Sequence, residues 1–224
     1  MIINFINLLI SSFITHGLLD FYTFRNIYDL STYILITIIY LYCMYILPSF
    51  CVLLFVISSM YHFGKDFYFF KFSKWSGVVL FSSSIVLHYD TWFQGVKYLN
   101  VEYPNVFIYT TCLSLIPGLI NCYHKPFGGL ISLCIGLGGP KCLFFYSCLF
   151  HAPLGVYRFH KKIGYIIWCG STIVLYFILP YIHIYNWMIK LSISVVMSHI
   201  VAISFWQYRN DKIDEIVEPV IIIK

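Results

Sequence analysis

The sequence predicts an all-α fold: a polytopic bundle of about eight or nine transmembrane helices that forms a single integral membrane domain over residues 1–224. Sixty per cent of the residues are hydrophobic and 21% are aromatic, whereas only 10% are charged. A soluble domain carries about 25% charged residues. Apolar runs of about 18 residues recur along the chain. The net charge of +5 is scattered and forms no basic stripe, so no nucleic-acid partner is expected.

The opening run, INFINLLISSFITHGLLDFY, predicts a retained first span over residues 2–19. It lacks the basic start and the small-residue cleavage site of a signal peptide. Seven further apolar runs predict spans at 30–47, 49–64, 76–96, 104–121, 141–157, 163–183 and 187–207.

The stretch PFGGLISLCIGLGGP at 126–140 allows more than one interpretation. It can merge with 141–157 into one long helix, form a re-entrant loop, or form a short pass of its own that ends at the glycines and Pro140. Counting it as a pass places nine basic residues on one side and three on the other. Merging it removes most of this bias. Because basic residues gather on the cytoplasmic side, we favour nine passes, with the N-terminus outside and the C-terminus in the cytoplasm.

Four of the eight histidines lie inside predicted odd-numbered passes, which run in the same direction: His16, His62, His151 and His199. Each is about 11 to 15 residues from the start of its pass, so their depths agree within about 6 Å. Ionisable groups in a bilayer are costly, and a set at one level indicates a functional site. We expect the remaining histidines in loops or at the membrane interface: His88, His124, His160 and His183.

Several neutral imidazoles suit iron, zinc or copper, and a site with an open position suits Fe(II) that binds O₂ or a substrate. Asp20 follows His16 by four residues, and Asp66 follows His62 by four. On a continuous helix each carboxylate shares a face with its histidine and can accept the second ring N–H. The alternative is that both aspartates are ordinary interfacial charges. Gly17 and Gly64, close to two of the histidines, are expected to let helices approach closely.

Four sequence blocks resemble those of the Brp/Blh family of membrane-embedded, iron-dependent β-carotene 15,15′-dioxygenases. The blocks are THGLLDF at 15–21, SSMYHFGKD at 58–66, GPKCLFFYSCLFHAPLG at 139–155 and MSHIVA at 197–202. They occur in the family's order and extend over nearly the whole chain. The chain is shorter than typical members.

The resemblance implies that His16, His62 and His151 are catalytic residues that bind iron. The family's third block usually ends in a second histidine, whose position is occupied here by Gly155. Either three ligands suffice, or another histidine substitutes, or the site is inactive. His199 matches the family's last histidine block and is the best candidate to complete the metal site. His160 ranks lower, since it lies on a different face and in a predicted loop.

The resemblance implies cleavage of β-carotene, or a related carotenoid taken from the bilayer, by O₂ at the central double bond to give two retinals. Fe(II) is the implied cofactor, and a rhodopsin is the implied acceptor of the product. Two alternatives stay open. Gly155 favours a catalytically inactive relative that binds a carotenoid or retinal. Paired histidines at one depth also allow a haem-binding membrane protein.

Overall fold

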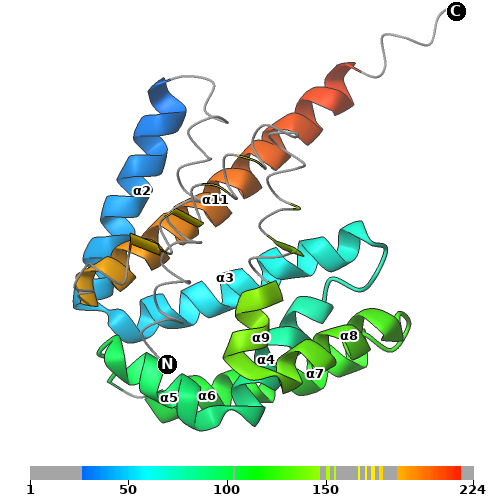
Figure 1. The fold of residues 1–224 in the computed structure, drawn as a ribbon. Coiled ribbons are helices and arrows are strands. Elements are labelled where there is room, and N and C mark those ends of the chain that lie inside the picture. The colour runs from blue at the N-terminus through cyan, green and yellow to red at the C-terminus, as the bar shows by residue number, and fades with distance from the viewer. Residues whose placement is uncertain are drawn as a thin grey trace, which may run out of the picture.

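The computed structural model describes residues 27–102, 104–146 and 186–217, together with 150–151 and a few isolated positions between 154 and 178. All elements of this part of the chain are helices (Figure 1), as predicted. They are α2 (Ile27–Ile46), α3 (Pro48–Phe69), α4 (Ser76–Leu87), α5 (Tyr89–Tyr98), α6 (Pro104–Leu113), α7 (Leu115–Asn121), α8 (Pro126–Leu137), α9 (Gly139–Tyr146) and α11 (Asn186–Val217).

Two of these helices are long and apolar enough to cross a membrane: α2, with 20 residues, and α3, with 22. They match the predicted spans 30–47 and 49–64. Pro48 occupies the first turn of α3, where its missing N–H leaves no helical hydrogen bond unmade, so the chain turns there. Four shorter apolar helices accompany them within the described residues.

Two predicted spans are divided in the structure. The span 76–96 is interrupted at His88, whose φ of −126° and ψ of 42° are not helical. The span 104–121 is interrupted between α6 and α7 at Ser114. The 76–96 span is therefore not one continuous helix, whereas at Ser114 the backbone stays in the helical region, with a φ of −70° and a ψ of −15°. Hydropathy averages over a window, and a break of one residue does not lower that average.

The stretch 126–140 does not merge with the following segment. Helix α8 ends at Leu137, and Gly139, at the start of α9, has a φ of +70°. A side chain is strained in that conformation, and glycine is not. A Cβ there would also come within 2.6 Å of the His88 ring. The single long helix over 126–157 is thereby excluded, and the 12 residues of α8 measure about 18 Å.

Small residues hold α8 against α4, the most extensively packed helix pair in the described part of the chain. Gly128, Ser132 and Gly136 are spaced four residues apart and are buried. A Cβ on Gly128 would come 2.6 Å from the hydroxyl oxygen of Ser76, and one on Gly136 would overlap the side chain of Ser83. Such close approach through small residues is typical of membrane helices.

Helices α3 and α4 also approach closely through glycines. A Cβ on Gly64 would overlap the carbonyl oxygen of Lys74, and one on Gly77 would overlap that of Met60. The expectation that Gly64 permits close helix contact is confirmed. Gly17 lies outside the described residues.

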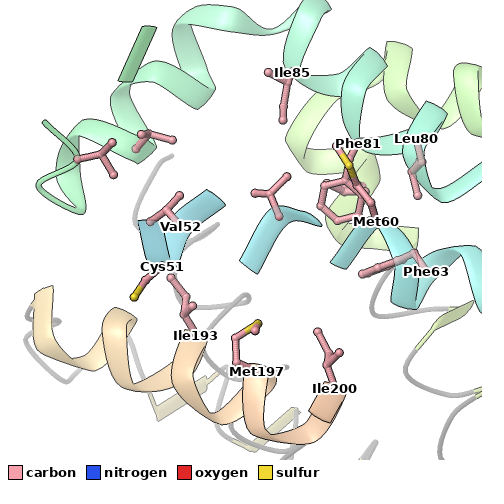
Figure 2. Close-up of a cluster of buried hydrophobic side chains, with 14 of the residues drawn as sticks. Cys51, Val52, Met60, Phe63, Leu80, Phe81, Ile85, Ile193, Met197 and Ile200 are labelled. Atoms are coloured by element: carbon pink, nitrogen blue, oxygen red, sulfur yellow. The ribbon is translucent and has the colours of Figure 1, made fainter. Parts of the chain in front are cut away.

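Helix α3 occupies the centre of the core. Figure 2 shows Ile193, Met197 and Ile200 of α11 on one side of α3, and Leu80, Phe81 and Ile85 of α4 on the other; all six are buried. Residues far apart in the sequence therefore meet on opposite faces of α3.

Helix α2 packs antiparallel to α11 (Figure 1). The hydroxyls of Thr37 and Ser198 are 2.8 Å apart, and the ammonium of Lys190 lies 4.1 Å from the ring centre of Tyr45. Residue numbers thus rise along α2, from Thr37 to Tyr45, where they fall along α11, from Ser198 to Lys190.

Candidate functional site

Helix α3 supplies the first side chains of the candidate site. His62 and Asp66 are one helical turn apart and share a buried face of the helix. Gly64 between them lets α4 approach so closely that this part of α3 is covered. An imidazole and a carboxylate are thereby held out of solvent at the middle of the bundle.

A second imidazole comes from the segment after α9. The backbone at Phe150 and His151 is π-helical, a geometry that is often found at functional sites. The ring centre of His151 lies 4.7 Å from that of His62, and the two ring planes meet at 81°. The structure thus joins two histidines that are 89 positions apart.

The third imidazole comes from α11. The ring centre of His199 lies 5.6 Å from that of His62, with the ring planes at 88°. His62 therefore makes an edge contact with each of the other two histidines. The four polar side chains of the site are all buried, with exposed fractions of 9% for His62, 4% for Asp66, 8% for His151 and 7% for His199.

Asp66 pairs with His151. Its Oδ2 lies 2.5 Å from Nδ1 of His151. If Nδ1–H donates a hydrogen bond to the carboxylate, the neutral ring carries on Nε2 the lone pair that metal ligation requires. The sequence prediction gave Asp66 to His62, four residues earlier on the same helix. The structure brings His151 to this carboxylate, because the fold places the segment at 150–151 onto that face of α3. The pairing of Asp66 with His62 stays a prediction.

The three imidazoles have the donor type and the spacing of a metal site. Two imidazoles that bind one ion at about 2.1 Å have ring centres about 4.5 to 5.5 Å apart, close to the observed 4.7 and 5.6 Å. A carboxylate on the second nitrogen of a ligating histidine is also characteristic of metal sites. The chemistry of these residues therefore fits a transition metal.

The described donors do not by themselves form a complete metal site. No group of three His, Cys, Asp or Glu side chains in the described ranges is arranged to hold a metal ion. The rings of His62 and His151, and those of His62 and His199, pack edge to face. A complete set requires reorientation of these rings or a further ligand, for which the sequence predicts His16. His16, Asp20 and Gly155 lie outside the described residues, so their placement stays a prediction.

Two other histidines are described, and neither belongs to the cluster of three. His88 stands at the break between α4 and α5, and its Nε2 lies 2.9 Å from the carbonyl oxygen of Leu137, at the end of α8. It therefore links two helix breaks. His124 is exposed and packs edge-on against Tyr123.

Aromatic rings border the histidines. Phe63 stacks on His151, with ring centres 4.1 Å apart and planes at 22°. Beyond Phe63 lie Tyr146, Phe67 and Phe150. The sequence prediction assigned no role to any single aromatic residue. The spacing of four residues from Phe63 to Phe67, and from Tyr146 to Phe150, is the signal that could have indicated two rings on one helix face.

No family model matches the chain, and no curated protein or solved structure matches it either. The resemblance to the β-carotene dioxygenases therefore stays a prediction that depends on the sequence blocks.

Proposed function

We propose that the chain is a multi-pass membrane protein that cleaves a carotenoid with O₂ at its central double bond, using Fe(II). One observation supports this function best: imidazoles from three separate segments meet in the interior of an apolar bundle, and a buried aspartate binds one of them. Polar groups are expensive to bury in such a place and are retained for function.

The outer surface supports insertion into a bilayer. Helix α2 is long enough to span, yet only 17% of its most apolar window is buried inside the protein. Its outward side chains include Ile34, Leu35, Ile38 and Ile39, all exposed. A contiguous apolar surface of this kind on a soluble monomer would be unusual. This surface suits contact with lipid. In the proposed topology the chain crosses the membrane about nine times, and its C-terminus lies in the cytoplasm.

In the proposed site His62, His151 and His199, with His16, hold the iron. When bound, Fe(II) would activate O₂, a reaction that amino-acid side chains alone do not provide. Asp66, as the acceptor of a hydrogen bond from Nδ1–H of His151, would favour the tautomer whose Nε2 carries the lone pair. Phe63 packs flat against His151 and restricts rotation of its ring. The apolar surroundings exclude water and accept a hydrocarbon substrate.

The main alternative is a relative that binds a carotenoid or retinal without cleaving it. Two observations favour it: Gly155 replaces a family histidine, and no three described donors are arranged around one point. The haem alternative is weaker. Axial imidazoles stand on opposite faces of a porphyrin, with nitrogens about 4 Å apart and the macrocycle between them. His62 and His151 are in direct edge contact.

Expression in cells that accumulate β-carotene tests the proposed function. The wild-type chain should bleach the cells and yield retinal, whereas His62→Ala and His151→Ala should leave the colour. His124→Ala is the matched control, because His124 is exposed and outside the cluster, and it should bleach like the wild type. Cells that keep their colour and contain no retinal would reject cleavage and favour the non-catalytic alternative.

A further inference from the structure

Four aromatic rings form a connected series next to the histidines, which we call the aromatic row: Phe63 and Phe67 on α3, Tyr146 at the end of α9, and Phe150. The ring of Tyr146 lies 5.8 Å from that of Phe63, 5.8 Å from that of Phe67 and 6.0 Å from that of Phe150. The planes of Tyr146 and Phe67 differ by 11°, and those of Tyr146 and Phe150 by 20°. Three of the four rings are therefore nearly parallel.

The aromatic row extends from the surface of the bundle to the site. Phe150 is 65% exposed, Tyr146 is half-buried, and Phe63 and Phe67 are buried. At its inner end Phe63 stacks on His151, the histidine that Asp66 binds. At its outer end Phe150 presents a bare ring where the proposed membrane protein would meet lipid. A series of aromatic ring contacts thus joins the proposed lipid boundary to the imidazoles.

We infer that the aromatic row is the route along which the conjugated chain of a carotenoid passes from the bilayer to the histidines. This inference rests on the proposed function, which supplies the ligand class. A polyene is flat, apolar and polarisable, and it stacks favourably on aromatic faces. Phe150, which is 65% exposed, offers such a face at the surface, and Tyr146 and Phe67 continue inward in nearly the same orientation. A ligand that follows them arrives beside His151 with its plane already set.

Two members of the aromatic row have different roles in the proposed route. Phe150 receives the chain from lipid, since it is the exposed ring. Tyr146 is a positioning residue, because it is the only ring of the row that contacts the other three.

Carotenoid binding without turnover tests the route. The full chain is reconstituted in lipid nanodiscs that contain β-carotene, under strict exclusion of O₂, so that binding is measured without cleavage. Quenching of tryptophan fluorescence by the carotenoid gives the affinity. Phe150→Ala should bind about two- to twelvefold more weakly, since one aromatic contact contributes about 0.5 to 1.5 kcal/mol. Phe127→Ala is the control: Phe127 is 69% exposed, lies on α8 and is outside the row, and its loss should leave affinity unchanged.

Two variants at Tyr146 complete the test. Tyr146→Phe keeps the ring and should bind like the wild type, whereas Tyr146→Leu removes the ring but keeps an apolar side chain and should weaken binding about as much as Phe150→Ala. Melting curves of all variants identify any loss of folding. Because Phe150 is mostly exposed, Phe150→Ala keeps the test valid even where a variant at Tyr146 unfolds.

Each remaining outcome is decisive. Normal affinity in Phe150→Ala, equal weakening in Phe127→Ala, or no binding by the wild type would overturn the route. The proposed function fails separately. If affinity depends on Phe150 but the aerobic protein releases no retinal, cleavage is rejected and the route stands. If retinal is released and Phe150→Ala binds normally, cleavage stands and the route is wrong.

Discussion

Oδ2 of Asp66 lies 2.5 Å from Nδ1 of His151, although the two residues are 85 positions apart. The pair ties the middle of α3 to the π-helical turn that carries His151, and both partners are buried. A buried hydrogen bond between a carboxylate and an imidazole fixes the ring orientation and its tautomer together. The position of His151 in the cluster therefore depends on Asp66.

Asp66→Asn should lower metal affinity about 10- to 100-fold, since the neutral amide is a weaker acceptor for the N–H of a ligating histidine. The measurement is competition for Fe(II), or for Co(II) as a stable substitute, against a chelator of known affinity. Asp90→Asn is the control, because Asp90 is exposed on α5. Equal metal affinity in Asp66→Asn and the wild type would show that the pair serves packing alone.

Metal should stabilise the protein through the histidine cluster. A metal at 100 times its dissociation constant adds about 2.7 kcal/mol to the free energy of unfolding, which appears as a higher melting temperature. His62→Ala and His199→Ala should abolish this shift, whereas His124→Ala should keep it. A shift of equal size in all four proteins would place the metal elsewhere. This measurement does not depend on catalysis.

Gly136→Ala should destabilise the fold by about 1 to 3 kcal/mol, because the added methyl overlaps Ser83 and a tightly packed interface does not absorb it. Gly95→Ala is the matched control: Gly95 is also helical, but a Cβ there meets nothing within 4 Å. That change should be neutral, or stabilising by up to about 1 kcal/mol. Denaturant titration in detergent compares the two. Equal effects would contradict the close α4–α8 contact.

Gly139→Ala should destabilise the protein for two reasons that can be separated. A side chain at a φ of +70° costs about 1 to 2 kcal/mol, and the new methyl also meets the His88 ring. In the background of His88→Ala only the first cost remains, so the same change should cost less there. A double-mutant cycle on the free energies of unfolding gives the difference. If the two changes are strictly additive, the His88 ring moves aside without cost when a methyl is added at residue 139.

The sequence predicted the positions of α2 and α3 closely, because both are long apolar runs separated by Pro48. It did not predict the breaks at His88 and Ser114. Such breaks depend on neighbours: His88 bonds the end of α8, and the hydroxyl of Ser114 lies 2.6 Å from that of Ser82 on α4. Helical hydrogen bonds persist at both positions, from the N–H of His88 to Ser84 and from the N–H of Gly118 to Ser114, so these contacts between helices accompany the local backbone bonds.

The grouping of histidines could be predicted in part. Equal depth on parallel passes indicated His62, His151 and His199, and the structure brings these three together. The partner of Asp66 could not be predicted, since helical spacing within α3 relates Asp66 only to residues of its own helix. Which residue covers that face is decided by a segment 85 positions away. The aromatic row was missed for the same reason: its rings come from two segments.

The antiparallel pairing of α2 with α11 has a consequence for biosynthesis. A ribosome delivers α2 and α3 early and α11 late, so α2 has no α11 to pack against until every intervening helix has been synthesised. His62 likewise waits for His199, which follows 137 positions later (199 − 62). Until then the buried face of α3 lacks its cover. Binding of the proposed metal would thus require that α11 has packed against α3, and a chain that ends before α11 should remain a target for quality-control proteases.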